Sequence, residues 1–337
     1  MSKENIQVCL AARPVGMPKD TDWDIKHSPI PKAEAGQFVA EVLYISLDPA
    51  MRGWMNDARS YIEPVAIGAV MRAGGVARVT ESNHDGFEVA DHVVCMTGVQ
   101  QFFVSDGEGV QKVDPSVAPL PTYLGVLGMT GLTAYFGLLD VAALKAGDIV
   151  VVSGAAGAVG SVVGQIARIK GCRVVGIAGG AEKCKYLVDE LGFDAAIDYK
   201  NDDVGKALKE HCPKGVDVFF DNVGGETLNT VLPFLRMHAR VAICGAISQY
   251  NNTTPVNGPS NYLSLLVSRA RMEGFIVFDF VQRYPEAIKA MAGWMAEGKL
   301  LSKEQIEDGI ENFPTVLLKL FSGGNFGKLI IKNTAAG

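Results

Sequence analysis

The sequence has few residues from which a metal site or a disulfide framework could be built. Its six cysteines are scattered, with no two closer than twelve residues, which excludes a CxxC zinc ribbon or redox pair and indicates reduced, mostly buried thiols. None of the five histidines has a cysteine or histidine partner at ligand spacing. Because a catalytic zinc ion needs about three converging ligands, the sequence predicts that no metal is bound.

Signals for export, membrane insertion and nucleic-acid binding are also missing. The stretch MSKENIQVCLAARP has no cationic lead followed by an apolar segment, so we expect a cytoplasmic protein. Two uncharged stretches, 115–139 and 149–167, are interrupted by prolines or glycines and are not interpreted as membrane spans. The net charge of −6 comes without a cluster of Lys and Arg interleaved with aromatic residues, which argues against a nucleic-acid partner.

The pattern of strands and helices is clearest from about residue 148 onward. Short β-branched runs alternate there with helical stretches, as in a parallel sheet covered by helices. The expected strands are 149–153, 172–178, 195–199, 216–221, 239–245 and 272–278. The expected helices include 182–191, 203–212, 227–237 and 285–298. Six strands with intervening helices predict an α/β fold with a doubly wound parallel Rossmann sheet.

The rest of the chain has a different pattern. At 337 residues with 48% hydrophobic composition, the chain is long enough for two domains. Residues 1–122 show short strands, Gly and Pro punctuation and little helical periodicity, which predicts a mostly β domain. The segment FGKLIIKN is expected to be a strand that returns to this domain. The expected domains are therefore 1–122 together with 301–337, and 123–300.

A glycine-rich segment, SGAAGAVGS, joins the first expected strand of the nucleotide domain to a helix. Ala155, Gly157 and Gly160 give the spacing AxGxxG, close to the dinucleotide-binding fingerprint. Gly157 would let the backbone approach a pyrophosphate, and Gly160 would let the helix pack closely on the sheet. Helix amides would then face the phosphates. The alternative is a strand-to-helix turn that simply requires small residues.

The end of the second expected strand discriminates between NAD and NADP. An NAD site usually has Asp or Glu about twenty residues after the glycine turn, where it binds the ribose hydroxyls. Here Ala178, Gly179 and Gly180 stand at that point, and Lys183 follows one short turn later. No carboxylate repels a 2′-phosphate and a cation stands nearby, so we expect NADP(H). The alternative for Lys183 is a solvated lysine on a helix face.

Seven segments, spread nearly end to end, resemble one known family. They are LAARPVGMPKDTDW, LYISLDPAMRGWM, LGMTGLTAYFGL, AAGAVGSVVGQIARIKGC, FDNVGGETLN, ICGAISQYN and GNFGKLII. The chain resembles the zinc-independent medium-chain dehydrogenase/reductases of the leukotriene B4 dehydrogenase type, which include prostaglandin, alkenal and bacterial curcumin reductases. The resemblance implies NADPH-dependent reduction of the C=C bond of α,β-unsaturated ketones and aldehydes. It also implies a GroES-like β catalytic domain, a cleft between the domains, a small-molecule substrate and commonly a homodimer.

The resemblance also implies which residues bind the cofactor. They are Ala156, Gly157, Ala158 and Val159 at the pyrophosphate, Lys183 and Tyr199 at the adenosine phosphate, Asn222, the loop Cys244, Gly245, Ala246, Ile247, Ser248, Gln249 and Tyr250, the stretch Phe275, Ile276 and Val277, and Asn325. Taken singly, Tyr199 could be an exposed strand-end aromatic, Asn222 a turn former and Cys244 a buried small hydrophobe. Their joint occurrence at the carboxyl ends of successive strands favours binding.

Reduction of an enone places negative charge on the carbonyl oxygen, so a fixed hydrogen-bond donor is expected there. Without zinc, tyrosine hydroxyls are the available donors, because their ordinary pKa of ~10 keeps them protonated at neutral pH. Tyr250 is the first candidate. The resemblance makes Tyr61 the second, because it matches a substrate-contacting tyrosine of some family members, while Tyr44 is as consistent with core packing. Asp48 and Arg52 are interpreted as a structural ion pair.

Two other functions stay open. A quinone oxidoreductase would share the glycine loop and the lack of zinc ligands. A protein that binds NADPH without turnover would share the whole cofactor site.

Overall fold

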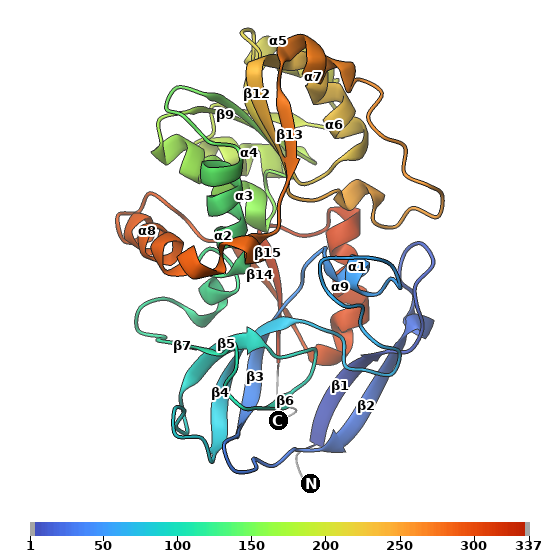
Figure 1. Ribbon diagram of the computed structural model, residues 1–337, viewed down its shortest axis with the longest axis vertical. Helices are drawn as coiled ribbons and strands as arrows, with labels where there is room; N and C mark the ends of the chain where they lie inside the picture. Colours follow the sequence, from blue (N-terminus) through green and yellow to red (C-terminus); the bar gives the residue numbers. More distant parts are fainter. Residues whose placement is uncertain (1–3, 334–337) are drawn as a thin grey trace. The chain divides into compact units, whose positions relative to one another are not determined.

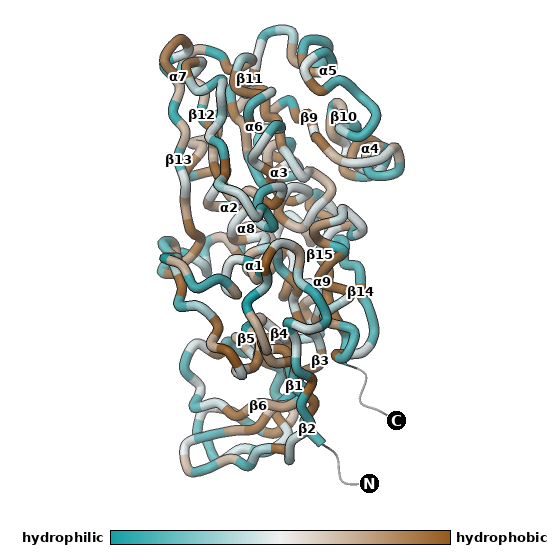
Figure 2. The backbone as a smooth tube through the Cα atoms, turned by 90° about the vertical axis from the view of Figure 1, so that its right-hand side faces the viewer, coloured by the Kyte–Doolittle hydropathy of each residue, from teal (hydrophilic) through white to brown (hydrophobic). Residues whose placement is uncertain are grey.

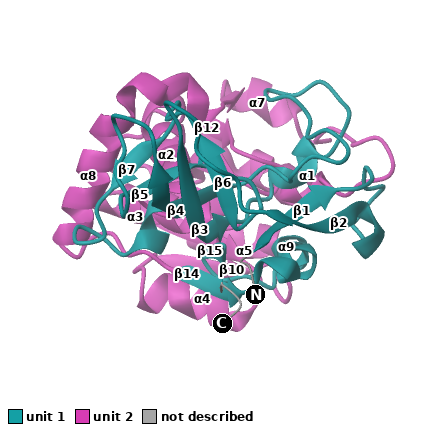
Figure 3. Cartoon of the chain, turned by 90° about the horizontal axis from the view of Figure 1, so that it is seen from below, with its two compact units in different colours: residues 1–124, 304–337 teal, residues 125–303 magenta. Residues whose placement is uncertain are grey.

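The chain folds into two compact units, described here from a computed structural model that covers residues 4–333. Unit 1 comprises the residues up to 124 and those from 304 onward, and unit 2 comprises residues 125–303 (Figure 3). Unit 2 contains a six-stranded sheet flanked by helices, and unit 1 is mostly β. The fold class expected from the sequence is therefore confirmed.

The sheet of unit 2 is parallel throughout, with the strand order β10-β9-β8-β11-β12-β13. Its strands are β8 (Ile149–Ser153), β9 (Arg173–Ala178), β10 (Ala195–Asp198), β11 (Val216–Asp221), β12 (Leu235–Ile243) and β13 (Arg271–Gly274). The chain starts in the middle, at β8, winds outward to β10, and then crosses to β11. The order therefore reverses between β8 and β11, and ligands of open α/β sheets bind beside such a reversal.

Helices cover both faces of this sheet, and α3 and α6 lie on opposite faces (Figure 1). The helices are α2 (Met129–Phe136), α3 (Ala158–Ile169), α4 (Ala181–Asp189), α5 (Val204–His211), α6 (Gly225–Val231), α7 (Leu263–Ser268) and α8 (Tyr284–Ala296). All five residues of β8 are buried, because a central parallel strand is covered on both faces. This explains why its sequence, IVVVS, is apolar without alternation.

Two expected elements end at least four residues earlier than the sequence pattern predicts, while the others end within about two residues of the prediction. The expected helix 227–237 stops early: α6 ends at Val231, a short 3-10 turn, η4 (Leu232–Phe234), contains Pro233, and β12 begins at Leu235. A proline cannot donate the backbone hydrogen bond that would continue the helix. The expected strand 272–278 ends at Gly274, which pairs with the last residue of β12, so the chain beyond it has no neighbouring strand.

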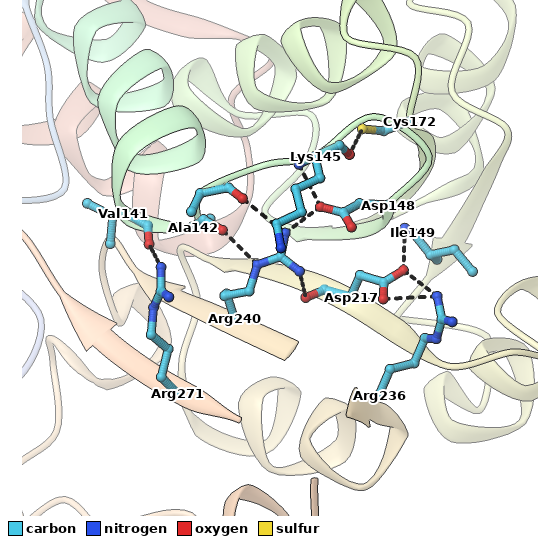
Figure 4. Close-up of polar contacts among 11 residues, drawn as sticks. Val141, Ala142, Lys145, Asp148, Ile149, Cys172, Asp217, Arg236, Arg240 and Arg271 are labelled. Atoms are coloured by element: carbon cyan, nitrogen blue, oxygen red, sulfur yellow. Dashed lines mark hydrogen bonds and ion pairs between the residues drawn. The ribbon is translucent and has the colours of Figure 1, made fainter. Parts of the chain in front are cut away.

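A polar cluster ties the amino-terminal edge of this sheet to the segment before β8 (Figure 4). Its centre is the buried guanidinium of Arg240 in β12. Arg240 donates to the carbonyls of Ala142 (2.9 Å), Ala143 (3.1 Å) and Asp217 (3.3 Å) and pairs with the Asp148 carboxylate. A buried charge is tolerated when it is paired and hydrogen-bonded, and here the partners come from the turn of residues 142–143, the residue before β8 and the start of β11.

Unit 1 contains a seven-stranded sheet and a separate two-stranded ribbon of β1 and β2 (Figure 1). Its strands are β1 (Glu4–Leu10), β2 (Trp23–Pro29), β3 (Phe38–Ser46), β4 (Gly74–Ser82), β5 (His92–Met96), β6 (Phe102–Ser105), β7 (Gln111–Val113), β14 (Glu304–Asp308) and β15 (Lys328–Lys332), and its helices are α1 (Met51–Trp54) and α9 (Phe313–Ser322). The main path runs β14-β15-β3-β4-β5-β7, and β6 pairs with β3.

The C-terminal strand β15 lies inside this sheet and pairs antiparallel with β3. Lys328 at its start is buried, and its ammonium group donates to the Leu47 carbonyl (2.9 Å) and to the Asp48 carboxylate (2.6 Å). A buried lysine needs such partners, so this contact fixes β15 against the end of β3.

Candidate functional site

The glycine turn after β8 has the close packing that its sequence predicts. Gly154 adopts φ +60°, a left-handed conformation that favours glycine. A Cβ added at Gly160 would lie 2.4 Å from the carbonyl oxygen of Gly154, so only glycine lets α3 pack this closely on the turn. Ala156 is buried, whereas Gly157, Ala158 and Val159 at the start of α3 are half-buried. The accessible backbone of the turn is therefore that of residues 157–159.

The turns after β9 and β10 bring a tyrosine and two lysines together. The ring of Tyr199 is half exposed and lies against the backbone of Gly179. Lys183 is half-buried in the first turn of α4, and burial, followed by the nearby charge of Lys200, lowers the pKa of its ammonium group. An anion bound beside Lys183 and Lys200 would offset the effect of the Lys200 charge on Lys183, so the pair is suited to hold one. The sequence predicts Lys183 and Tyr199 at this site but not Lys200.

Asp198, the last residue of β10, holds these two turns together. Its carboxylate accepts hydrogen bonds from the backbone N–H of Gly180 (2.7 Å) and Lys200 (3.1 Å) and from the side chain of Asn201 (2.7 Å). These donors, first among them Gly180, hold the pKa of the carboxyl below its usual value. Asp198 was not predicted as a site residue, although an acid that ends an apolar strand is a signal that could have been used.

Asn222 lies at the reversal of strand order and is fully engaged with β8. Its backbone N–H donates to the Ser153 hydroxyl (2.9 Å), and its side-chain amide donates to the Ser153 carbonyl (2.8 Å). The Ser153 hydroxyl in turn donates to the buried carboxylate of Asp221 (2.7 Å). Burial raises the pKa of the Asp221 carboxyl. The sequence alone does not indicate Ser153 or Asp221 as site residues.

The loop after β12 carries the largest group of predicted cofactor residues. It includes a 3-10 turn, η5 (Ile247–Gln249), and ends at Tyr250, whose hydroxyl accepts a hydrogen bond from the backbone N–H of Ala246 (3.1 Å). Burial raises the pKa of the Cys244 thiol to about 12, so the thiol stays protonated and unreactive at neutral pH. This agrees with the interpretation of Cys244 as a small hydrophobe.

The stretch after β13 turns its aromatic side chain into unit 2. The Phe275 ring packs edge-on to Phe220, with ring centroids 6.1 Å apart, and a Cβ added at Gly137 would lie 2.3 Å from it. Val277 is buried, and its carbonyl accepts a hydrogen bond from the Tyr284 hydroxyl (3.1 Å). Of residues 275–277, the backbone and the half-buried side chains of Phe275 and Ile276 could therefore contact a ligand.

Three of the predicted residues belong to unit 1. The Tyr61 side chain is half exposed, and its hydroxyl accepts a hydrogen bond from the Trp54 indole (3.2 Å). The side-chain amide of Asn325 donates to the Gly327 carbonyl (3.2 Å) in the turn before β15. Tyr44 lies in β3 opposite Val76 and packs against a small apolar cluster, in line with core packing.

The expected ion pair of Asp48 with Arg52 was wrong. Arg52 is buried and donates to the carbonyls of Pro14 (3.0 Å) and Gly16 (3.1 Å) and to the Asn56 side chain (2.6 Å), while Asp48 pairs with Lys328. The Asp48 carboxylate pairs instead with Lys328 of β15, which is distant in the chain and is not revealed by the local sequence.

Within residues 4–333, no three His, Cys, Asp or Glu side chains gather closely enough to hold a metal ion. The helices of the described chain also include none that is long and apolar enough to cross a membrane. Metal independence stays a prediction, to be tested directly.

Two sequence families match this chain. The family described as "N-terminal domain of oxidoreductase" matches residues 7–113, and the family described as "Zinc-binding dehydrogenase" matches residues 158–293. The NADPH-dependent curcumin reductase of Escherichia coli (strain K12) is 42% identical over 335 residues, which cover 98% of this chain and 97% of the relative. The chain belongs to the zinc-independent medium-chain dehydrogenase/reductases. The family expected from the sequence is thus confirmed.

Other medium-chain dehydrogenase/reductases are similarly close. The 2-alkenal reductase (NADP(+)-dependent) of Nicotiana tabacum is 41% identical over 333 residues, with 97% of each chain covered. The crystal structure of CurA from Vibrio vulnificus in complex with NADPH matches with a TM-score of 0.93 and 45% identity, covering 98% of this chain and 99% of that one. The similarity therefore extends over both units of the chain.

Proposed function

We propose that this protein reduces the C=C bond of α,β-unsaturated ketones and aldehydes with NADPH. The observation that carries the proposal is the end of β9, where Gly179 replaces the acid of an NAD site and Tyr199 and Lys183 lie beside it. The relatives named as NADPH-dependent curcumin reductase and 2-alkenal reductase, together with the NADPH complex of CurA, support the same cofactor and reaction class.

Unit 2 is proposed to be the NADP-binding domain. Residues 156–159 would face the pyrophosphate, and Lys183 and Tyr199 the adenosine phosphate. Asn222, residues 244–250 and residues 275–277 would border the nicotinamide half, and Asn325 would add a contact from unit 1. The support is that the unit 2 residues among these follow the carboxyl ends of β8, β9, β10, β11, β12 and β13, the edge at which open α/β sheets bind ligands.

The proposed chemistry needs one donor from the protein. NADPH, when bound, would supply a hydride for the β-carbon of the enone, and negative charge would develop on the carbonyl oxygen. A proton from solvent would then complete the reduction at the α-carbon. Tyr250 is proposed to donate a hydrogen bond to that oxygen. Its hydroxyl accepts the Ala246 N–H bond, which orients the phenol and strengthens it as a donor.

Unit 1 is proposed to be the GroES-like catalytic domain, with Tyr61 as a second contact for the substrate. Trp54 donates to the Tyr61 hydroxyl, so the tyrosine is held by its own unit. A small-molecule substrate and a cytoplasmic location stay predictions of the sequence.

The deciding experiment follows NADPH absorbance with a panel of enones, enals, quinones and saturated aldehydes. We expect oxidation of NADPH with enones and enals and a product in which the C=C bond is reduced and the carbonyl is kept. Turnover of quinones alone would favour the quinone oxidoreductase alternative. Tight NADPH binding without oxidation by any acceptor would favour a non-catalytic NADPH-binding protein.

A homodimer is also proposed, through the outer edge of the unit 2 sheet. β13 is the terminal strand of that sheet, and all four of its residues are exposed. Next to β12, α7 exposes Leu263, Leu266 and Val267, and it is coloured as hydrophobic in Figure 2. A second copy related by a two-fold axis would pair edge to edge and cover these side chains.

A further inference from the structure

The carboxylate of Asp221 lies at the centre of two loops that both carry proposed cofactor residues. Asp221 ends β11 and is completely buried, and the Ser153 hydroxyl, from the end of β8, donates to it (2.7 Å). The hydrogen bond crosses the point at which the strand order reverses. Serine and aspartate are 68 residues apart in sequence, so the contact is a product of the fold.

The same carboxylate shapes the turn that follows β11. The backbone N–H groups of Val223 (3.0 Å) and Gly224 (3.0 Å) donate to it, and Gly224 adopts φ +68°. Because these N–H groups bind the Asp221 side chain, the carbonyl groups of the turn can accept hydrogen bonds from another segment. The Ser153 hydroxyl also accepts a hydrogen bond from the backbone N–H of Asn222, so the position of the turn is fixed relative to β8.

The carbonyls of that turn receive the N–H groups of the loop after β12. The Asp221 carbonyl accepts from Cys244 (2.9 Å), and the Asn222 carbonyl accepts from Ile247 (3.2 Å). The Val223 carbonyl accepts from the backbone N–H (3.2 Å) and the hydroxyl (2.6 Å) of Ser248. One buried side chain therefore fixes the first loop, and the first loop fixes the second, which ends at Tyr250.

We propose that Asp221, together with Ser153, is a positioning residue that sets the nicotinamide half of the cofactor site while leaving the adenosine half unaffected. The inference rests on the proposed function, because it assumes that residues 222 and 244–250 border the nicotinamide. The adenosine half is organised separately, by Asp198, which holds the turns of Gly180 and Lys200. The two halves thus depend on two different strand-end acids.

The test compares two ligands on Asp221→Ala protein, at a temperature where the variant is folded. NADPH engages both halves of the site, whereas adenosine 2′,5′-bisphosphate engages only the adenosine half. We expect the dissociation constant of NADPH to rise roughly tenfold or more, as for loss of hydrogen bonds to a charged group, and that of the bisphosphate to stay within about twofold of wild type. Amide hydrogen exchange of residues 244–248 should also accelerate without ligand.

Two further variants keep the test decisive. Ser153→Ala keeps the Asp221 carboxylate but removes the hydroxyl that links it to β8. Like Asp221→Ala, it should weaken NADPH binding and not bisphosphate binding, but by a smaller factor. Asp217→Ala removes an acid of the same strand at the opposite edge of the sheet, and it should leave both dissociation constants unchanged. Equal weakening of both ligands by the Asp221 and Ser153 variants, or unchanged NADPH binding, would overturn the proposal. The test measures binding alone, so it does not depend on whether the wild-type protein reduces enones.

Discussion

The ring of Tyr199 lies so close to Gly179 that a Cβ added to the glycine would be 2.8 Å from a ring carbon. NAD sites have an acid at this position after β9, whereas here the Tyr199 ring covers the glycine. A longer residue at Gly179 would have to displace the ring. The turn is built to present an aromatic face and the neighbouring lysines, which suits an adenosine that carries a phosphate.

Replacing Lys183 by alanine should weaken NADPH selectively. The lost charge-assisted hydrogen bond is worth about 1.5–3 kcal/mol, or roughly 10- to 150-fold in affinity, and NADH lacks the phosphate that would make it. Titration of both nucleotides by fluorescence measures the two dissociation constants. Lys185→Ala, an exposed lysine two residues further along α4, serves as the control. Equal losses for NADPH and NADH would contradict the role given to Lys183.

Tyr250→Phe should slow enone reduction while changing NADPH affinity little. A donor to a developing oxyanion is worth ~2.7–4 kcal/mol, although water or a ribose hydroxyl can replace part of it. The measurement is the single-turnover rate of hydride transfer with several enones. Tyr61→Phe should give a smaller loss that varies more with the substrate, and Tyr262→Phe, at an exposed tyrosine, none. Wild-type rates in Tyr250→Phe would leave Tyr250 as a wall of the cofactor site only.

The sequence predicted the sheet of unit 2 well, because its signal is local. A parallel strand that is covered on both faces appears in the sequence as a largely apolar run, such as IVVVS or VDVFFD. The glycine turn is likewise encoded in consecutive residues. Element ends were less predictable. Pro233 lies where the expected helix 227–237 ends early. The end of β13 depends instead on where its neighbour β12 stops.

The candidate site was predictable only where a residue type is informative by itself. Lys183 stood out because it follows, one short turn later, a strand end that lacks the expected acid. Ser153 and Asp221 did not, because their importance comes from a contact between strands that are not consecutive in the chain. Asp48 was misassigned for the same reason, since Lys328 reaches it from β15.

Activity should survive removal of metal ions. The described residues offer no cluster of ligands, and the proposed reaction uses a tyrosine where other dehydrogenases use a Lewis acid. The measurement is enone turnover after extensive dialysis against a chelator, with elemental analysis of the same sample. Stoichiometric zinc together with chelator-sensitive turnover would contradict this prediction.

Arg240→Met should destabilise the protein far more than Arg236→Met. The first change leaves the Asp148 carboxylate buried without its charge partner, which costs about 3–5 kcal/mol. The second removes a cation that is 43% exposed, and the Asp217 carboxylate left behind keeps its hydrogen bond from the Ile149 N–H (2.9 Å), so the loss should be nearer ~1 kcal/mol. Thermal unfolding should show a Tm lower by about 5–20 °C for Arg240→Met. Similar Tm values for both variants would argue against the role of the cluster.

The wild-type protein should sediment at twice the chain mass of 35.9 kDa. The double change Leu266→Lys and Val267→Lys places two charges on the exposed face of α7 and should shift the protein to the single-chain mass. Val117→Lys, at an equally exposed apolar residue of unit 1, is the control and should leave the mass unchanged. A single-chain mass for the wild type would remove the proposed dimer.

The position of β15 between β14 and β3 also sets the order in which the units mature on the ribosome. Residues 125–303 are synthesised as one continuous segment that contains every strand of its own sheet. β3 is synthesised much earlier, yet its last three residues, Tyr44–Ser46, have an open backbone edge until residues 330–332 arrive. The first unit to begin translation is thus the last to be finished. Until β15 arrives, this unpaired strand edge can pair with a wrong partner.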